Sequence, residues 1–343
     1  MKILPSKIKR RDFLKVGSMV AGGLMLSTPA QGKKVFFNRT LGQSQLQPNP
    51  VLAKLGFSNT DRVLIAQLDD LGTCQSNMSA YSDLTGAGII NSAAVMAPCI
   101  WFPLVAHLAR TIPRLDFGLQ LALTSEWDTI RWRPLSTVDP KSGLLDADGF
   151  YPKSVAELPS SVNETILDQE FDAQLNRALN MGVRLTHLDS HQSIAFDPRF
   201  TNSMSQLAKK YSFPLVFLRP NPAQWNSSSW MNPSWVANGL NFATQLEQAG
   251  LPLLDSITDL TPSSSASRMS DVEKYITQLP SGLHLIRIHA ANHTPEIEAM
   301  TPDWAGYVAD LNSWIRTDMK SFIEKSGVKT IGWAPIKALV KAG

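Results

Sequence analysis

The chain has 343 residues, of which 43% are hydrophobic and 18% charged, a balance that excludes a disordered chain and a membrane-helix bundle. A chain of this length buries a sizeable core, as one large α/β barrel or as two smaller domains, without a disulfide to hold it together. The formal charge of +3 comes from the N-terminus, where the first 30 residues hold six basic side chains and one acidic one. The rest of the chain is slightly acidic, so we expect no nucleic-acid partner.

Residues 1–30 have the pattern of an export signal. Lys9-Arg10-Arg11-Asp12-Phe13-Leu14-Lys15 precedes a short apolar stretch, and the small residues Ser27-Thr28-Pro29-Ala30 suit a cleavage site. The twin arginine resembles the twin-arginine export signal, so we expect the twin-arginine machinery as a partner and a periplasmic location. The apolar stretch is too short for a stable membrane span, and we expect none in the mature form; the alternative is a basic amphipathic helix or anchor.

The first elements are expected in the following order. Residues 31–60 predict a flexible tether, because glutamine and proline break any periodicity, and the folded domain is expected over residues 61–343. An apolar run at residues 63–66 is typical of a buried parallel strand, and it ends at Asp69-Asp70. A helix over residues 77–84, a strand over 89–96, a helix over 103–109 and a strand over 116–123 follow.

The second half begins with residues 124–162, which are irregular and rich in proline, glycine and tryptophan. This segment is too long for an ordinary connection and predicts an active-site insertion, and residues 219–234 form a second long loop. Helices are expected over residues 164–181, 198–211, 235–249, 271–279 and 301–325, and strands over 184–188, 215–218, 251–254, 283–288 and 328–332.

This alternation predicts an α/β fold with mainly parallel strands, and seven or eight such units indicate a closed or nearly closed (β/α) barrel. No glycine-rich phosphate-binding loop follows a strand, which disfavours a nucleotide-binding doubly wound sheet. Cys74 and Cys99 each follow a predicted strand. They could form a bridge in an exported protein, but two free buried thiols are the favoured interpretation.

Polar residues gather at the predicted strand ends, where sites form in barrels of this kind. Asp69 and Asp70 end the first strand, and adjacent buried carboxylates are tolerated where a cation or a proton takes up their charge. The alternative for this pair is a solvated turn or helix cap. His187-Leu188-Asp189-Ser190-His191 holds three ionisable side chains at a strand end, a setting typical of metal ligation, although a satisfied polar strand end is the alternative. The other strand-associated candidates are Gln120, Arg219 and His289.

At this point several segments together resemble one family, the YdjC-like carbohydrate deacetylases. The resemblance covers roughly residues 62–339, with the motifs in the expected order, which makes chance agreement improbable. The segments that resemble family motifs are Leu64–Gly72, Gly118–Trp127, Arg131–Pro134, Thr186–His191, Thr301–Trp304 and Ile331–Trp333.

The resemblance implies a divalent-metal deacetylase, using Mg or Zn, on a barrel-like α/β fold. Such enzymes remove acetyl groups from N-acetylated amino sugars or oligosaccharides, so the implied partner is an N-acetylated saccharide. Asp70 and His191 match metal ligands of the family, and Asp69 matches its proposed general base. His289 falls where the family carries a late histidine, which makes it a candidate general acid. In the implied reaction a metal held by Asp70 and His191 would supply a Lewis acid for the acetyl carbonyl, and Asp69 would take a proton from water.

One position departs from the family pattern. The middle motif normally supplies a histidine ligand, and this chain has Gln120 there. An amide oxygen is a harder and weaker ligand than imidazole. Gln120 could therefore ligate through its oxygen, water could fill the place, or the protein could be a catalytically impaired carbohydrate-binding homologue. A third hypothesis is a metal-dependent hydrolase with another ester or amide substrate.

Further residues are expected to support the site or to bind substrate. They are His187, Asp189, Arg219, Trp127 and Trp132. Aromatic faces suit stacking on sugar rings, so Trp225 and Trp230 of the second long loop are candidate groove walls as well. The alternative for all four tryptophans is that they pack the loops onto the barrel.

Overall fold

The computed structural model describes residues 47–160, 162–228, 231–260 and 265–340. The chain divides into two compact units, Met1–Lys34 and Val35–Gly343, and every described residue belongs to the second. The export signal predicted over residues 1–30 lies outside the described residues. Among the described helices none is long and apolar enough to cross a membrane.

Seven strands form one sheet in the order β4-β3-β2-β1-β6-β5, with β7 paired to β1. Every strand pair is parallel, which confirms the predicted α/β fold. The central strand β1 begins with an apolar run and is buried along almost its whole length, because helices cover the sheet. The strands are β1 (Arg62–Leu71), β2 (Ser92–Val95), β3 (Phe117–Leu121), β4 (Leu185–Ser190), β5 (Ser256–Asp259), β6 (Gly282–Ile288) and β7 (Val328–Thr330).

The two edges of the sheet are joined through residues 215–218. Leu215 forms an isolated parallel bridge with Leu188 of β4, and Leu218 forms one with Leu254, two residues before β5. These bridges give the sheet a barrel-like closure. The strands predicted over residues 215–218 and 251–254 are reduced to these single bridges, and the strand beside β6 starts later than predicted, at Ser256.

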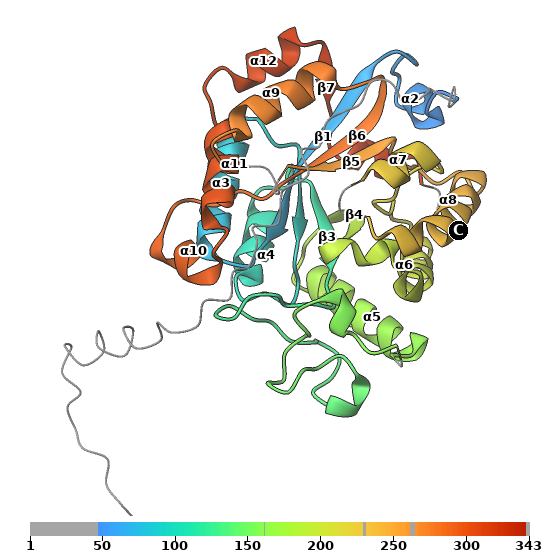
Figure 1. The fold of residues 1–343 in the computed structure, drawn as a ribbon, viewed down its shortest axis with the longest axis vertical. Coiled ribbons are helices and arrows are strands. Elements are labelled where there is room, and N and C mark those ends of the chain that lie inside the picture. The colour runs from blue at the N-terminus through green and yellow to red at the C-terminus, as the bar shows by residue number, and fades with distance from the viewer. Residues whose placement is uncertain (1–46, 161, 229–230, 261–264, 341–343) are drawn as a thin grey trace, which may run out of the picture. The chain divides into compact units, whose positions relative to one another are not determined.

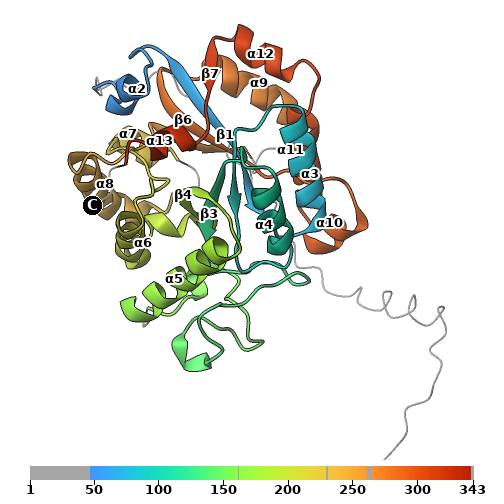
Figure 2. The same ribbon diagram turned by 180° about the vertical axis from the view of Figure 1, so that it is seen from behind.

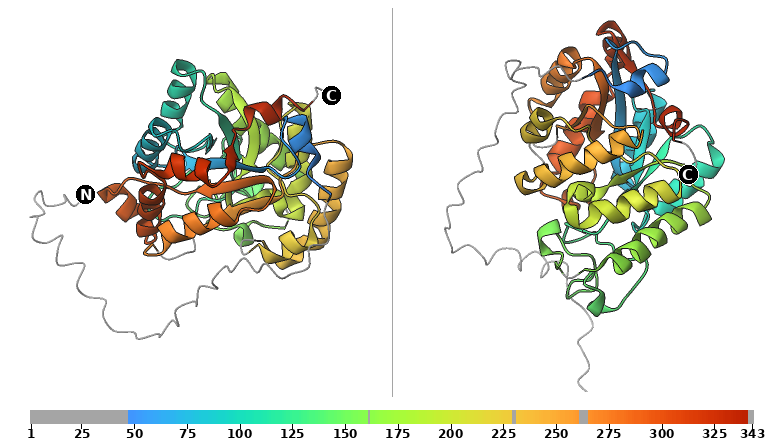
Figure 3. Two further views of the ribbon diagram at one scale, coloured as in Figure 1. Left: turned by 90° about the horizontal axis from the view of Figure 1, so that it is seen from above. Right: turned by 90° about the vertical axis from the view of Figure 1, so that its right-hand side faces the viewer.

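Helices surround the strands (Figures 1, 2 and 3). In Figures 1 and 2, α3, α10 and α11 flank one side of the sheet, and α5, α6, α7 and α8 flank the other. Most helices follow the predicted ranges, but the helix predicted over residues 301–325 is two helices, separated where Arg316 pairs with Asp318 and Glu273. The helices are α2 (Pro50–Lys54), α3 (Gln75–Gly86), α4 (Phe102–Thr111), α5 (Glu164–Asn180), α6 (Pro198–Lys210), α7 (Pro222–Ser227), α8 (Val236–Gln248), α9 (Arg268–Gln278), α10 (Pro295–Met300), α11 (Trp304–Trp314), α12 (Met319–Lys325) and α13 (Ala334–Lys337).

The described residues before β1 are packed against the domain. Asn49 caps α2 through Val51 N–H, and its Nδ2 donates to the Leu253 carbonyl at 2.9 Å and to Asp255 at 2.8 Å. Val51 and Leu52 are buried in the core. Residues 47–60, which the tether prediction included, therefore belong to the folded unit, because apolar side chains of α2 are buried in its core; residues 31–46 lie outside the described residues.

The insertion predicted over residues 124–162 lies beyond the end of β3, at one end of the sheet (Figures 1 and 2). Its regular structure within the described residues is two short 3₁₀ helices, η2 (Pro140–Ser142) and η3 (Val155–Glu157). The fully buried Glu170 of α5 fastens it, since this carboxylate accepts hydrogen bonds from the Leu135 and Ser136 backbone and from the Tyr151 hydroxyl. The insertion is thus held in a fixed position beside the strand ends.

Candidate active site

Two strand ends carry unusual backbone geometry. Asp70 in β1 has a φ of 58°, and its carbonyl accepts hydrogen bonds from the backbone and the hydroxyl of Thr73. Gln192 and Ser193, which follow His191 at the end of β4, have φ values of 49° and 56°. Non-glycine residues with positive φ are uncommon, and such strained conformations concentrate at functional sites. The positive φ angles change the direction of the backbone at Asp70 and directly after His191.

The His191 imidazole lies between two carboxylates. Its Nδ1 is 3.0 Å from Asp70 Oδ1, and its Nε2 is 2.9 Å from Glu126 Oε2. Burial alone would lower the pKa of His191, but Glu126 and Asp70 together raise it well above its usual value. Burial alone would likewise raise the pKa of Asp70, but the charge of His191 outweighs it and holds that pKa below the usual range.

Asp69 sits in a buried polar network. Its Oδ1 accepts a hydrogen bond from Gln67 at 2.8 Å and its Oδ2 accepts one from Gln120 at 3.2 Å, while Arg287 Nε lies 3.4 Å from Oδ2. Burial and the nearby charge of Asp189 raise the pKa of Asp69, and the guanidinium of Arg287 only partly offsets this. A carboxyl with a raised pKa is suited to accept a proton near neutral pH.

His289 follows β6 and faces the same cluster. Its Nε2 lies 3.8 Å from Asp70 Oδ2 and its Nδ1 lies 3.7 Å from Asp259 Oδ1, and its backbone N–H donates to Asp310 at 3.1 Å. Burial alone would lower the pKa of His289, but the charges of Asp259 and Asp70 raise it to about 8. Its ring packs edge-on against Tyr307. A histidine that stays protonated at neutral pH is suited to donate a proton.

Gln120 uses both ends of its side-chain amide on protein partners. Its Oε1 accepts the Asp70 backbone N–H at 3.1 Å, and its Nε2 donates to Asp69. The amide oxygen has a second lone pair, so a metal-ligand role for Gln120 stays a prediction. The geometry gives Gln120 a bridging role, because it holds the Asp69 carboxylate and the Asp70 backbone together.

The family resemblance implies a divalent metal, and the chemistry of two side chains fits one. Two ligands bound at about 2.1 Å and at a right angle are about 3.0 Å apart. Asp70 Oδ1 and His191 Nδ1 have this separation. Among the described residues no group of three or more His, Cys, Asp or Glu side chains is arranged to hold a metal ion. A metal held by Asp70 and His191 would therefore take its other ligands from water or substrate.

A second layer of buried groups lies beneath these residues. Gln67 Nε2 donates to Asp189 as well as to Asp69, and the Trp333 indole N–H donates to Gln67 Oε1 at 3.0 Å. Arg287 also pairs with Asp189, at 3.0 Å. Asp189 is thus brought into the cluster as predicted, where it supports Asp69 from below.

His187 lies deeper in the barrel-like interior. Its ring is fully buried, stacks on Trp333 with centroids 4.6 Å apart, and has its Nδ1 3.0 Å from the Thr186 hydroxyl. Burial lowers the pKa of His187 well below its usual value, so the ring is neutral. His187 packs against Gly118 and Trp333, so it contributes to the site by packing.

Two of the predicted aromatic residues stand beside the cluster. Trp132 packs edge-on against His191 with ring centroids 5.8 Å apart, and Trp127 packs edge-on against Trp132. Both indoles are buried, so they close the site on the insertion side. Trp225 is fully buried between aromatic rings and is a core residue, and Trp230 lies outside the described residues.

Arg219, like Trp225, is a predicted site residue that the structure places elsewhere. Its side chain binds Glu247 at 2.6 Å, Asp255 at 3.0 Å and the Gln47 carbonyl. Asp255 also accepts the Leu283 N–H, which is at the beginning of β6, whereas the site lies beyond its end. The prediction assumed a full strand over residues 215–218, and the single bridges there place Arg219 among structural ion pairs instead.

Several residues of the cluster were not singled out from the sequence. Gln67 and Arg287 are polar residues in buried strands, each two positions before a predicted site residue, and period-two alternation could have found them. Glu126 and Trp333 lie inside segments that carry the family resemblance, but nothing in their spacing shows what they contact. Asp259 ends β5, whose position was misplaced.

The fold and the site together define a class of protein. It is a barrel-like α/β protein that gathers carboxylates and imidazoles at the carboxyl ends of its parallel strands, the usual place for catalysis in such folds. The chain belongs to the YdjC-like protein family, whose model matches residues 63–325.

Relatives in this family share a description. The chain is 29% identical to a carbohydrate deacetylase of Thermus thermophilus over 260 residues, which covers 76% of this chain and 88% of that protein. It is 28% identical to a chitooligosaccharide deacetylase of Yersinia enterocolitica, over 57% of this chain and 75% of that protein. A solved structure from Enterococcus faecalis V583, described as a "putative cellobiose-phosphate cleavage protein", superposes with a TM-score of 0.63 at 19% identity, covering 82% of this chain and all of that one. This last likeness supports the fold.

Proposed function

We propose that the protein is a metal-dependent deacetylase that hydrolyses the acetamide of N-acetylated amino sugars or their oligosaccharides. The observation that carries the proposal is the convergence of four ionisable side chains at one end of the sheet. Asp70 lies 3.0 Å from His191 and 3.8 Å from His289, and Gln120 links Asp69 to Asp70. Family membership and relatives that are carbohydrate deacetylases support the reaction and the substrate class.

Asp70 and His191 would hold the metal, which supplies a Lewis acid for the acetyl carbonyl when it is bound. The chain prepares these ligands by two means. Glu126 accepts a hydrogen bond from the far nitrogen of His191 and fixes the orientation of the ring, and Trp132 packs against that ring. Gln120 holds the Asp70 backbone in its strained conformation.

Asp69 is the proton acceptor in this proposal. Its raised pKa lets it take a proton from the attacking water, and Gln67 and Gln120 hold its two oxygens in place. His289 is the proton donor to the departing amine, since Asp259 and Asp70 keep it protonated at neutral pH. Trp127 and Trp132 limit the access of bulk water from the insertion side.

The experiment that tests the proposal is an acetate-release assay. The purified chain is incubated with N-acetylated chito-oligosaccharides while Mg²⁺, Zn²⁺, Mn²⁺ or Co²⁺ is supplied in turn. We expect acetate release that Asp69→Asn lowers by at least about 100-fold, because general base catalysis contributes factors of this order. Arg219→Gln serves as the matched control, since Arg219 lies outside the cluster. Absence of acetate with every metal would refute the proposal.

A second function has its own observation, the amide of Gln120 in place of an imidazole. Because this amide bridges Asp69 and Asp70, it can preserve the shape of the site without binding a metal. The protein would then be a carbohydrate-binding homologue with impaired catalysis. Gln120→His separates the two: it should create metal binding and activity in a binding protein, whereas in an active enzyme it breaks two native hydrogen bonds and leaves existing turnover the same or lower.

We further propose that the chain is exported to the periplasm by the twin-arginine machinery. The support is the segment Lys9–Lys15, with its adjacent Arg10 and Arg11, before an apolar stretch. Fractionation of cells that produce the full chain should place it in the periplasm. Replacement of both arginines by lysine should retain it in the cytoplasm, and periplasmic delivery of that variant would overturn the proposal.

A further inference from the structure

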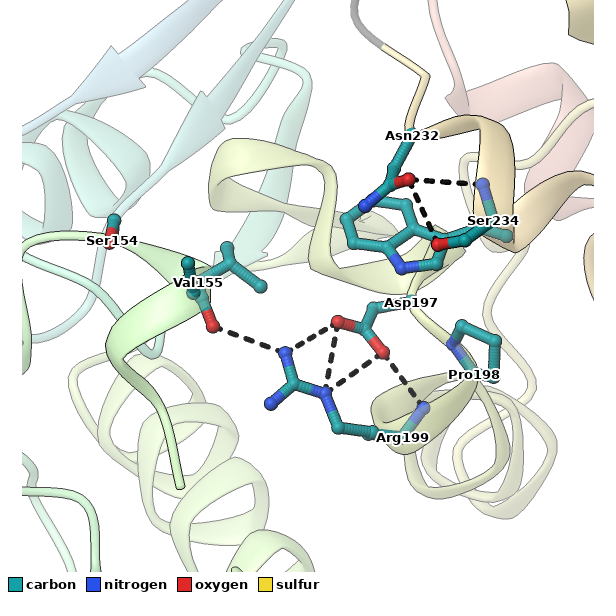
Figure 4. A pocket seen from close by; sticks show the side chains of 9 residues that line it. Ser154, Val155, Asp197, Pro198, Arg199, Asn232 and Ser234 are labelled. Carbon is teal, nitrogen blue, oxygen red and sulfur yellow. Dashed lines mark hydrogen bonds and ion pairs between the residues drawn. The ribbon is translucent and has the colours of Figure 1, made fainter. Parts of the chain in front are cut away.

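A second concave site lies beside the candidate active site. It is a cavity of about 590 Å³, within the size range of small-ligand pockets. Its walls come from η3 of the insertion, through Ser154 and Val155, and from the 3₁₀ helix η5 (Pro233–Trp235), through Ser234 and Trp235. Figure 4 shows these walls on either side of Arg199. We name this site the distal cavity.

The floor of the distal cavity is a closed ion pair. The guanidinium of Arg199 contacts the Asp197 carboxylate through Nε and Nη2, the latter at 2.7 Å, and the Asp197 carboxylate also caps α6. Arg199 Nη1 also donates to the Leu158 carbonyl and Nη2 to the Val155 carbonyl, as Figure 4 shows for Val155. The positive charge of the floor is therefore balanced by Asp197, and four of the five guanidinium N–H groups are used within the protein. An anionic ligand would find no unpaired cation among the described residues of this cavity.

The chain connects the distal cavity directly to the candidate active site. The 3₁₀ helix η4 (His191–Phe196) begins at the proposed metal ligand and ends next to Asp197 in the cavity floor. The insertion likewise holds Glu126, which contacts His191, near its start, and reaches the cavity wall at Ser154. The same two segments thus contribute residues to both sites, which is the observation that favours one extended ligand over two separate ones.

The lining groups indicate the kind of ligand. Trp235 offers an aromatic surface and is only partly buried, and Asn232 and Ser234 beside it are exposed. A neutral floor, an aromatic surface and exposed amide and hydroxyl groups together favour a neutral ring that carries hydroxyl groups. Asn232 Oδ1 and the Ser234 hydroxyl already bond to each other at the rim, and their exposed positions keep them within reach of a ligand's hydroxyl groups.

We propose that the distal cavity binds a sugar unit of an oligosaccharide whose N-acetylated unit occupies the candidate active site. This inference rests on the proposed function and deepens it, because it assigns the protein to oligosaccharides rather than to free amino sugars. Trp235 is the residue on which the distant sugar ring stacks.

The test measures affinity and turnover as a function of glycan length. N-acetylglucosamine and its β-1,4-linked oligomers of two, four and six units are titrated into the chain by calorimetry, and acetate release is measured for each. We expect affinity to rise with length. Trp235→Ala should weaken binding of the longest oligomer about tenfold, and should leave the single sugar unchanged. Trp235→Phe, which keeps an aromatic face, should restore most of the loss.

Two further variants guard against a fault in folding. Phe57→Ala removes a partly buried aromatic residue before β1, at the opposite end of the sheet, and should change nothing. Ala156→Leu narrows the distal cavity from an exposed position. It should weaken the binding of the longest oligomer, as Trp235→Ala does.

The outcomes for the two proposals are distinct. Two results would refute the proposal that the distal cavity binds a sugar unit. One is an affinity that does not depend on glycan length, and the other is a loss of affinity in Trp235→Ala that is equal for all glycan lengths. Length-dependent binding that needs Trp235, without acetate release under any metal, would overturn the deacetylase and leave the distal cavity standing.

Discussion

A single added methyl group at Gly118 tests the packing beneath the candidate active site. An ideal Cβ at this position would lie 2.1 Å from Nε2 of His187 and 2.2 Å and 2.3 Å from Cε1 and Cδ2 of the same ring. Ordinary contacts of a Cβ atom begin near 3.4 Å, so the ring would have to move by more than 1 Å. Gly118→Ala therefore tests whether the His187 ring can move far enough to accommodate the added methyl group.

The surroundings of His187 leave no such space. The ring is fully buried, its face lies on Trp333 at a centroid distance of 4.6 Å, and its Nδ1 is 3.0 Å from the Thr186 hydroxyl. Overpacking of a tight core costs about 1–3 kcal/mol, and the loss of one buried hydrogen bond adds about 1 kcal/mol. We expect Gly118→Ala to lower the free energy of unfolding by roughly 3 kcal/mol.

Urea-induced unfolding followed by circular dichroism measures this change. Gly86→Ala is the matched control, because Gly86 ends α3 and a Cβ added there would meet no neighbouring atom within 4 Å; alanine at that position should be neutral or stabilise by up to about 1 kcal/mol. The double variant Gly118→Ala/His187→Ala removes the clash, so its loss should be smaller than the sum of the two single losses. Additive losses, or a neutral Gly118→Ala, would refute the reasoning.

Three further predictions concern other buried contacts. Trp333→Phe removes the donor to Gln67 Oε1 and should destabilise the protein by about 1–3 kcal/mol in urea unfolding, since that buried oxygen loses its partner. Burial lowers the pKa of His284. Below about pH 6.5 the unfolded chain therefore binds a proton at this residue more readily than the folded chain does, and the free energy of unfolding falls as the pH drops. Between about pH 7.5 and 5.5 the wild type should lose up to about 1.4 kcal/mol more than His284→Gln, and equal losses would contradict this. Glu170→Ala releases the insertion and should speed trypsin cleavage at Lys141, whereas an unchanged cleavage rate would show that other contacts hold it.

The sequence predicted the parallel α/β architecture because strands buried on both faces leave continuous apolar runs. The run at residues 63–66 became the core of β1, and the run at residues 283–288 became β6 almost residue for residue. The same signal failed at residues 215–218 and 251–254, which are apolar and buried but pair through single bridges. Burial produces an apolar run whether or not a ladder forms, so composition alone does not separate the two cases.

The site was located by the rule that parallel strands end at a common edge. This rule brought Asp69, Asp70, Asp189, His191 and His289 together, since each ends or follows a strand that was correctly placed. It misplaced Arg219, because no regular strand precedes that residue. The rule does not predict contacts that depend on the path of a loop. The contact between Glu126, near the start of the insertion, and His191 is one of these.

Charge balance explains why these residues depend on one another. Burial raises the pKa of Asp69, and the charge of Asp189 adds to this effect; the guanidinium of Arg287, which both carboxylates face, offsets it only in part. Burial would raise the pKa of Asp70 as well, but His191 lies 3.0 Å away and its charge holds the pKa of Asp70 below the usual range. Two adjacent carboxyl groups thus come to differ in proton affinity, which suits one to accept a proton and the other to remain an anion that can bind a cation. Gln120 joins them without adding charge, and a histidine in its place would change that balance as well as the set of ligands.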